Sequence, residues 1–292
     1  MDERLEAFLS RAEALLERLE PLLPPAAAEP DWSAATAFRW RRRGGGGWLE
    51  PIERPHRIGL DELHGVDEQK AALERNTRQH LAGLPANNAL LWGARGTGKS
   101  SLVKALHTAY AGEGLRTVEV EPDHLVDLPE ILGLLGRRPE RFIVFCDDLS
   151  FDASDHHYRA LKAVLDGSLA SAADNVLVYA TSNRRHLLPE SQQENQRGGE
   201  GGEIHPGDAV EERISLSERF GLWLSFYSFD QERYLAICRG WLERLGVSAP
   251  EGEALRQAAL AYALARGSRS GRVAWQFARD WAGRARLEEG GG

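Results

Sequence analysis

The stretch Gly93-Ala94-Arg95-Gly96-Thr97-Gly98-Lys99-Ser100 matches the pattern G-x-x-x-x-G-K-[ST] at every defined position. An apolar run at residues 88–92 precedes it as a predicted strand, and a helical pattern at residues 99–111 follows it. In this setting, successive backbone N–H groups turn inward around a polyphosphate at the positive end of the helix. Lys99 would contact the β- and γ-phosphates, and the Ser100 hydroxyl would ligate Mg²⁺. The alternative is a glycine-rich turn without a ligand.

The composition of the chain indicates a packed globular protein. It has 292 residues, of which 42% are hydrophobic and 27% charged, and its net charge is −8. An acidic chain is not typical of a protein coated by nucleic acid, so any such contact would be local. Two cysteines, Cys146 and Cys238, make neither a disulfide framework nor a zinc site. With no secretory leader and no membrane-spanning run, we expect a cytoplasmic protein without membrane contact.

From residue 58 onward, short apolar runs alternate with helical patterns. This alternation predicts a doubly wound parallel sheet of five strands, the α/β class of the P-loop proteins, over residues 58–228. Only helical patterns follow, which predicts a small all-α lid over residues 229–287. The predicted strands are residues 88–92, 117–120, 142–146, 176–181 and 222–226. The predicted helices are residues 67–80, 99–111, 231–245, 251–265 and 271–284.

The N-terminal part of the chain has a different character. Residues 1–24 have apolar positions at helical spacing, which predicts an amphipathic helix that packs either on a partner or on its own core. Residues 25–57 are rich in proline, arginine and glycine and predict a linker or a loose hairpin. Within it, Arg39 to Arg43 would either hold a phosphate backbone, with tryptophan stacking on bases, or form a solvated turn. Residues 190–208 predict an exposed loop.

Two adjacent acids, Asp147 and Asp148, follow the apolar strand at residues 142–146. Ligands of doubly wound sheets bind beyond the carboxyl ends of the strands, where the phosphate loop also lies. We therefore predict that Asp147 holds the Mg²⁺ bound by Ser100 and that Asp148 polarises the attacking water. The alternative role for Asp148 is a helix N-cap. Asn183, at the end of the next apolar strand, would orient this water or touch the γ-phosphate, unless it only forms a turn.

Two arginines are further candidates for the site. Arg219 stands just before the last predicted strand, and a guanidinium suits the charge that builds on a transferring phosphoryl group. Its alternative is a surface pair with Glu218. Arg272 opens the last predicted helix, where it either folds over the nucleotide or is exposed.

Together these residues resemble the AAA+ ATPases over roughly residues 58–284. Residues 83–88, 215–226 and 267–272 look more narrowly like a bacterial AAA+ group known as domain of unknown function 815. The resemblance implies a Walker A lysine and hydroxyl at Lys99 and Ser100, a Walker B pair at Asp147 and Asp148, and sensor 1 at Asn183. It further implies an arginine finger at Arg219, with Arg213 as its rival, and sensor 2 at Arg272. The implied nucleotide-binding residues are Gly65, Val66, the loop from Gly93 to Ser100, Ser101 and Arg272.

The resemblance implies an oligomeric ATPase that binds ATP and Mg²⁺, takes its finger from a neighbouring subunit and remodels a macromolecular partner. The usual pair in this family is Asp-Glu, so Asp148 departs from it, and we see no aromatic-hydrophobic-glycine pore loop. The alternative is a slow-turnover switch or loader acting on nucleic acid, which the arginine-tryptophan segment and the Asp-Asp pair favour. A GTPase or kinase is a third possibility, but the chain has no Asn-Lys-x-Asp motif for guanine.

Overall fold

A computed structural model describes residues 30–43, 46–150, 156–165, 173–183, 218–247 and 253–290, together with four isolated positions near the N-terminus. Three of the sequence predictions lie largely or wholly outside these residues. They are the N-terminal helix at 1–24, the loop at 190–208 and the rival finger Arg213.

The centre of the fold is a seven-stranded sheet in the order β2-β1-β4-β5-β6-β3-β7. All neighbours in it are parallel except the β1–β2 pair. The strands are β1 (Ala37–Arg43), β2 (Gly46–Pro51), β3 (Ala89–Gly93), β4 (Leu115–Val120), β5 (Arg141–Cys146), β6 (Val176–Ser182) and β7 (Leu222–Phe226). The five predicted parallel strands are therefore confirmed, and the hairpin adds two more.

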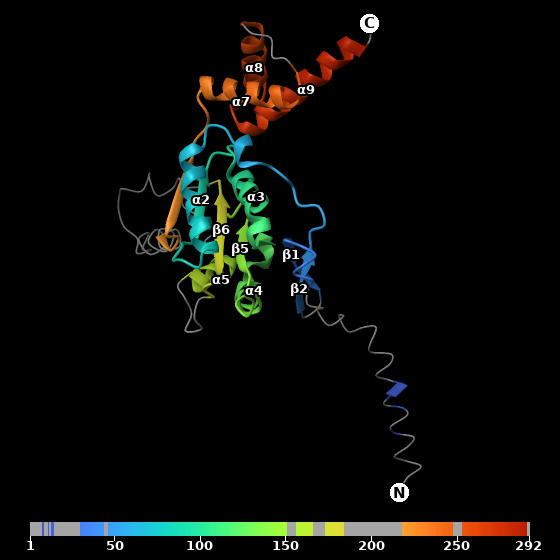
Figure 1. Cartoon of the computed structure of the whole chain (residues 1–292), viewed down its shortest axis with the longest axis vertical. Coiled ribbons are helices and arrows are strands. Elements are labelled where there is room, and N and C mark those ends of the chain that lie inside the picture. Colours follow the sequence, from blue (N-terminus) through green and yellow to red (C-terminus); the bar gives the residue numbers. More distant parts are fainter. Residues whose placement is uncertain are drawn as a thin grey trace, which may run out of the picture.

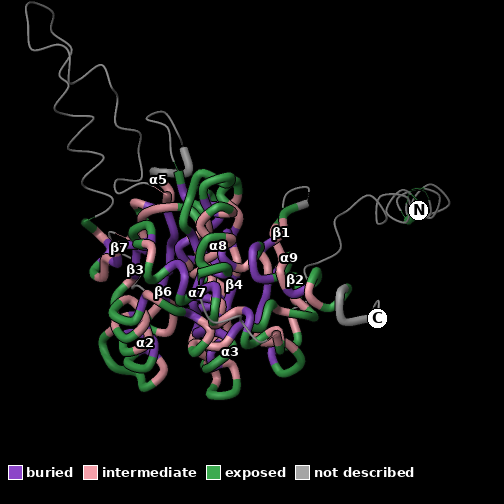
Figure 2. Tube along the Cα trace, turned by 90° about the horizontal axis from the view of Figure 1, so that it is seen from above, coloured by how far each residue is buried: buried purple, intermediate pink, exposed green. Residues whose placement is uncertain are grey.

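Successive strand residues point to opposite faces, and both faces of the sheet are covered (Figure 2). Leu91, Ile143 and Tyr179 pack on one face with the helices α2 (Asp67–Leu81) and α3 (Lys99–Tyr110). Leu90, Val144 and Val178 pack on the other face with α4 (Leu128–Leu135) and α5 (His156–Leu165). Burial on both sides explains why these strands are continuous apolar runs, as is usual for parallel sheets.

Within the segment predicted as a linker or loose hairpin, β1 and β2 pair antiparallel and extend the sheet. β1 lies parallel to β4, with Ala37 opposite Thr117, and β2 forms the outer edge. Trp40 is 1% exposed, and its Nε1–H donates to the buried carboxylate of Asp127 across 3.0 Å. Arg39, Arg41 and Arg42, for which a phosphate contact and a solvated turn were the alternatives, are paired with carboxylates of this chain. The ion pairs are Arg39–Glu119, Arg41–Glu50, Arg41–Glu121 and Arg42–Asp127.

Three helices follow β7 and lie together at one end of the molecule (Figure 1). They are α7 (Gln231–Arg244), α8 (Glu253–Ala265) and α9 (Gly271–Gly290). The carboxylate of Asp230 accepts a hydrogen bond from the Arg233 N–H and so caps α7. The core of the lid is continuous with the face of the sheet that carries α2 and α3. Among the described residues, the shorter segments are the 3₁₀ helices η2 (Leu60–Glu62), η3 (Ala111–Glu113) and η4 (Pro122–Asp127).

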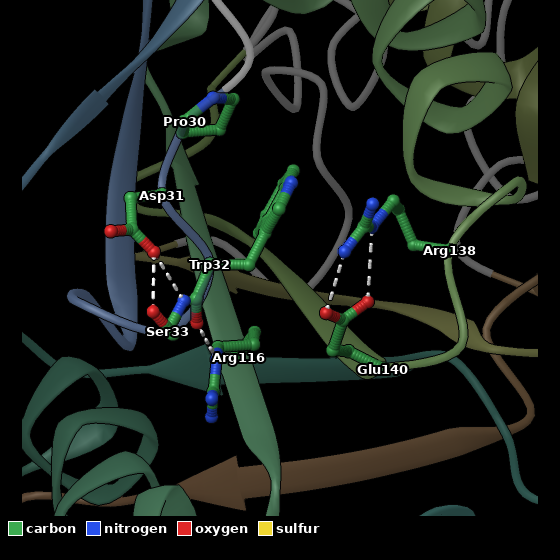
Figure 3. Close-up of a pocket in the computed structure, with 7 residues that line it drawn as sticks. All are labelled: Pro30, Asp31, Trp32, Ser33, Arg116, Arg138 and Glu140. Carbon is green, nitrogen blue, oxygen red and sulfur yellow. Dashed lines mark hydrogen bonds and ion pairs between the residues drawn. The ribbon is translucent and has the colours of Figure 1, made fainter.

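A hollow of about 430 Å³ lies near the amino ends of β4 and β5, at the opposite edge of the sheet from the phosphate loop. Figure 3 shows Trp32 between the Asp31–Ser33 turn and the Arg138–Glu140 ion pair. The Arg138 guanidinium also lies 5.3 Å from the centroid of the Trp32 ring. These contacts hold the segment before β1 against the amino ends of β4 and β5. Within the described residues, no helix is long and apolar enough to cross a membrane.

Candidate functional site

The phosphate-loop candidate begins where β3 and β7 end side by side. The Ala94 N–H donates to the Phe226 carbonyl across 2.9 Å. Gly93 has a φ of 131°, and a Cβ added there would lie 1.9 Å from the Phe226 carbonyl oxygen, so only glycine fits. Gly98, with a φ of 103°, is the N-cap of α3, and an added Cβ would meet no atom within 4 Å. The loop is therefore held against β7 and open beside the first turn of α3.

Lys99 is 6% exposed and its ammonium group lies at the centre of this loop. Nζ donates to the carbonyls of Gly93 and Ala94 across 2.8 and 2.7 Å and to Asn183 Oδ1 across 3.1 Å. Burial lowers the pKa of Lys99. The carboxylates of Asp148 and Asp147 oppose this by raising its pKa, whereas Arg95 and Arg272 lower it. A partly desolvated cation beside a helix N-terminus attracts anions strongly.

Ser100 and Asp147 lie together as predicted for a magnesium site. The Ser100 hydroxyl, in the first turn of α3, donates to Asp147 Oδ1 at the end of β5 across 2.6 Å. The same oxygen accepts a hydrogen bond from the Thr181 hydroxyl on β6, also across 2.6 Å. Three elements therefore meet at one carboxylate oxygen. Thr181 was not predicted, because a threonine at the end of an apolar strand is common for packing reasons alone.

Asp148 has a φ of 55°, the one left-handed non-glycine residue among those described. Its backbone N–H donates to the Thr181 hydroxyl across 2.8 Å, and its carboxylate accepts a hydrogen bond from the Asn183 side chain. Because Asn183 also accepts from Lys99, its amide joins the lysine to the acid. The side chains of Lys99 at the start of α3, Asp148 after β5 and Asn183 after β6 are thus brought together.

The lid contacts the phosphate loop directly. The Arg272 N–H, at the start of α9, donates to the Gly96 carbonyl across 3.3 Å. A Cβ added to Gly96, whose φ is 74°, would lie 2.9 Å from Ser270 Oγ, so a larger residue would push the lid away. Val66 is 4% exposed and packs in the core that contains the lid. Gly65 and Val66, the residues predicted to flank adenine, therefore lie at the base of the lid.

Arg219 lies away from the phosphate loop of its own chain. It precedes β7 at the end of the sheet where Leu222 pairs with Ala89, whereas the phosphate loop begins at the other end, beside Phe226. The span from Leu222 to Phe226 is roughly 13 Å at the usual rise per strand residue. The structure therefore does not bring Arg219 to the phosphate loop of its own chain.

The residues at the carboxyl edge of the sheet fit a magnesium nucleotide. Ser100 and Asp147 supply hydroxyl and carboxylate oxygens, which are the ligands that Mg²⁺ prefers. Lys99 and the N-terminus of α3 supply positive charge for phosphate oxygens. The open side of Gly98 leaves space beside that terminus. Among the described residues, no group of three or more His, Cys, Asp or Glu forms a further metal site.

Comparisons with known proteins agree with this architecture. The family model described as protein of unknown function (DUF815) matches residues 33–285. A search of curated protein sequences found no match. A RuvB variant of Thermotoga maritima aligns with a TM-score of 0.50 and 16% identity, over 76% of this chain and 64% of that one. A second RuvB variant from this organism aligns with a TM-score of 0.49 and 17% identity, over 76% and 63%.

The chain thus spans less than two thirds of the length of these RuvB structures. The Holliday junction branch migration motor RuvB of the same organism aligns less well, with a TM-score of 0.43 and 14% identity, over 75% of this chain and 70% of that one. At 16% identity, the alignment with a TM-score of 0.50 shows a common fold and nothing further. That fold is the P-loop AAA+ arrangement predicted from the sequence.

Proposed function

Because the chain belongs to the DUF815 family and has the AAA+ fold, we propose that it is an ATPase that binds and hydrolyses MgATP. The observation that supports this most is the meeting of the first residue of α3 with residues that follow two neighbouring strands. Lys99 follows β3, Asp148 follows β5 and Asn183 follows β6, and their side chains are joined by hydrogen bonds. This arrangement is expected of a nucleotide-binding loop and is not expected of a glycine-rich turn without a ligand.

In this proposal each residue has a separate task. Lys99 and the backbone N–H groups of the loop bind the β- and γ-phosphates, and Ser100 with Asp147 holds Mg²⁺, which neutralises charge on the phosphates when bound. Asp148 accepts a proton from the attacking water, and Asn183 orients this water. Arg272, at the contact between lid and loop, senses the γ-phosphate. Gly65 and Val66 flank the adenine.

We further propose that the protein works as a homo-oligomer that remodels a macromolecular partner in the cytoplasm. Arg219 lies at the edge of the sheet opposite the phosphate loop, so it serves as a finger only in the site of a neighbouring copy. A head-to-tail interface of this kind generates a ring or an open helix. The two domains proposed for this cycle are residues 58–228, which bind the nucleotide, and residues 229–287, which form the lid.

A slow-turnover switch is the second candidate, and the conformation around Asp148 favours it. Aspartate is one methylene shorter than the usual glutamate, and its carboxylate is engaged by Asn183. A loss of positioning by about 1 Å lowers a rate by about a hundredfold. The nucleic-acid part of this candidate has weaker support, since Arg39, Arg41 and Arg42 bind carboxylates of the chain itself.

Phosphate release by the purified chain in MgATP tests the proposal. We expect ATP-dependent release by the wild type and only background release by Lys99→Ala, which loses the cation of the loop. Release that is equal in both proteins would come from a contaminant and would refute the proposal. Slow release without an initial burst, together with tight ATP binding, would favour the switch, because its hydrolysis step is slow. Affinity capture with Asp148→Asn in ATP then identifies the partner.

A further inference from the structure

Thr181 occupies a position that the five assigned motifs of the site do not include. It is the sixth residue of β6, 1% exposed, and lies two positions before Asn183. Its neighbour across the sheet is β5, whose carboxyl end leads directly into Asp147 and Asp148. The hydroxyl therefore lies on the strand that leads to the asparagine and bonds the two acids that follow the neighbouring strand.

The hydroxyl of Thr181 acts as donor to one acid and acceptor from the other. It donates its proton to Asp147 Oδ1 across 2.6 Å and accepts the Asp148 backbone N–H across 2.8 Å. The Thr181 carbonyl also accepts the Leu149 N–H across 2.7 Å. The threonine hydroxyl can both donate and accept a hydrogen bond at this β-branched position. Valine has no polar group, and the thiol of cysteine is a weak donor and a weak acceptor.

These hydrogen bonds constrain the orientation of the Asp147 carboxylate and the backbone conformation of Asp148. The bond to Asp147 selects one orientation of its carboxylate, so that the oxygen bound by Ser100 and Thr181 faces α3. The bond from the Asp148 N–H holds a backbone with a φ of 55°, which directs the Asp148 side chain toward Asn183. A left-handed conformation at a non-glycine residue costs free energy and persists only where the surroundings hold it.

We propose that Thr181 is the positioning residue that sets both acids of the site, the first for Mg²⁺ and the second for water. This inference rests on the proposed function, because it assigns Asp147 to Mg²⁺ and Asp148 to the attacking water. Thr181 touches neither the nucleotide nor the metal in this scheme. It acts through the acids, as outer partners of metal ligands do, and their loss weakens metal binding or activity by about ten- to a hundredfold.

Thr77 offers a matched control. It is also a fully buried threonine, 0% exposed, and lies on α2. Its hydroxyl bonds the Leu73 carbonyl and the Tyr179 hydroxyl across 2.9 Å each, and neither partner belongs to the site. Thr77→Val and Thr181→Val therefore remove the same group from equally buried positions. Only the second removes it from the acids.

The experiment measures equilibrium binding of fluorescent mant-ADP in excess Mg²⁺ and in EDTA, together with phosphate release. The ratio of the two dissociation constants reports how much Mg²⁺ strengthens binding. We expect Thr181→Val to reduce this ratio by about tenfold and kcat by a similar factor. Affinity in EDTA should be unchanged, because the phosphate loop is intact. Thr181→Ser, which keeps the hydroxyl, and Thr77→Val should both retain the wild-type ratio.

An unchanged ratio in Thr181→Val would overturn the inference, and so would an equal loss in Thr77→Val, which would show a general effect of a buried hydroxyl. If Thr181→Val does not fold, Thr181→Cys takes its place, since its thiol replaces the hydroxyl with a weak hydrogen-bond donor. A wild type without any Mg²⁺ dependence would also overturn it. A wild type that binds magnesium nucleotide but releases no phosphate would refute the proposed ATPase and leave the tenfold effect on binding as the test of Thr181.

Discussion

Replacing Arg219 with alanine should leave nucleotide binding intact and abolish turnover, and a second inactive variant should restore part of it. Arg219 lies at the opposite end of β7 from the loop at Gly93, so it completes a neighbour's site in our proposal. Asp148→Asn keeps Arg219 but lacks the acid that accepts the proton from water. Neither variant alone has a complete site. In a mixed oligomer, the loop of an Arg219→Ala subunit meets the intact arginine of an Asp148→Asn subunit.

The expected magnitude follows from the geometry of a head-to-tail interface. Loss of an arginine finger lowers the rate by about a thousandfold or more, so each variant alone should be close to background. With equal amounts and random assembly, half of the subunits carry an intact acid and half of their neighbours carry an intact arginine. About one quarter of the interfaces are then complete, and the mixture should reach about a quarter of wild-type activity.

The assay is steady-state phosphate release from mixtures at constant total protein and varied composition. Subunit exchange is verified by energy transfer between labelled copies, and mant-ATP binding verifies that Arg219→Ala folds and binds nucleotide. Activity should rise from background at both ends to a maximum at equal amounts.

A flat profile at background, with subunit exchange demonstrated, would refute the argument that Arg219 acts on a neighbouring site. A fully active Arg219→Ala variant would remove this arginine from catalysis altogether.

Three further outcomes are expected. Asp148→Asn alone should bind mant-ATP as the wild type does but release phosphate at least about a hundredfold more slowly, because it removes the general base. Asp127→Ala should lower the free energy of unfolding in urea by about 2 kcal/mol by leaving the buried Trp40 N–H without its acceptor, and in a Trp40→Phe background the loss should shrink. Burial lowers the pKa of His80 from 6.5 to about 4, so the unfolded chain binds a proton that the native chain does not. Stability should therefore fall as the pH falls from 6.5 to 4, by up to about 3 kcal/mol. In His80→Gln, urea midpoints should change less over this range, and an identical pH dependence would contradict the assignment.

Much of the central fold was predictable from local patterns. The strand at β7 was predicted at its observed bounds, and β3, β5 and β6 within one residue, because continuous apolar runs between polar turns identify doubly buried strands. The loop at residues 93–100 and Asp147 were predicted to lie at the same end of the sheet, because parallel strands end together, and the structure has them there. Predicting the place of Asn183 required one further fact, the position of β6 between β5 and β3.

Long-range pairing was not predictable in the same way. β1 lies beside β4, which begins 72 residues after β1 ends (115 − 43), and no local pattern encodes this neighbour. The ion pairs of the hairpin arginines depend on that pairing, because Glu119 and Glu121 come from β4 and the turn after it. The role of Thr181 was hidden for a related reason. Its two hydrogen bonds join residues 33 and 34 positions away.

The left-handed backbone at Asp148 limits which acid this position accepts. Aspartate and asparagine adopt such a conformation more readily than longer side chains, because their short polar groups bond locally. A glutamate would extend the carboxylate toward the phosphates by about 1.5 Å but would do so on a backbone that disfavours it. At this position, therefore, the length of the acidic side chain and the backbone conformation cannot be changed independently. An exchange of Asp148 for glutamate alters both, and its effect on turnover cannot be read as a change of length alone.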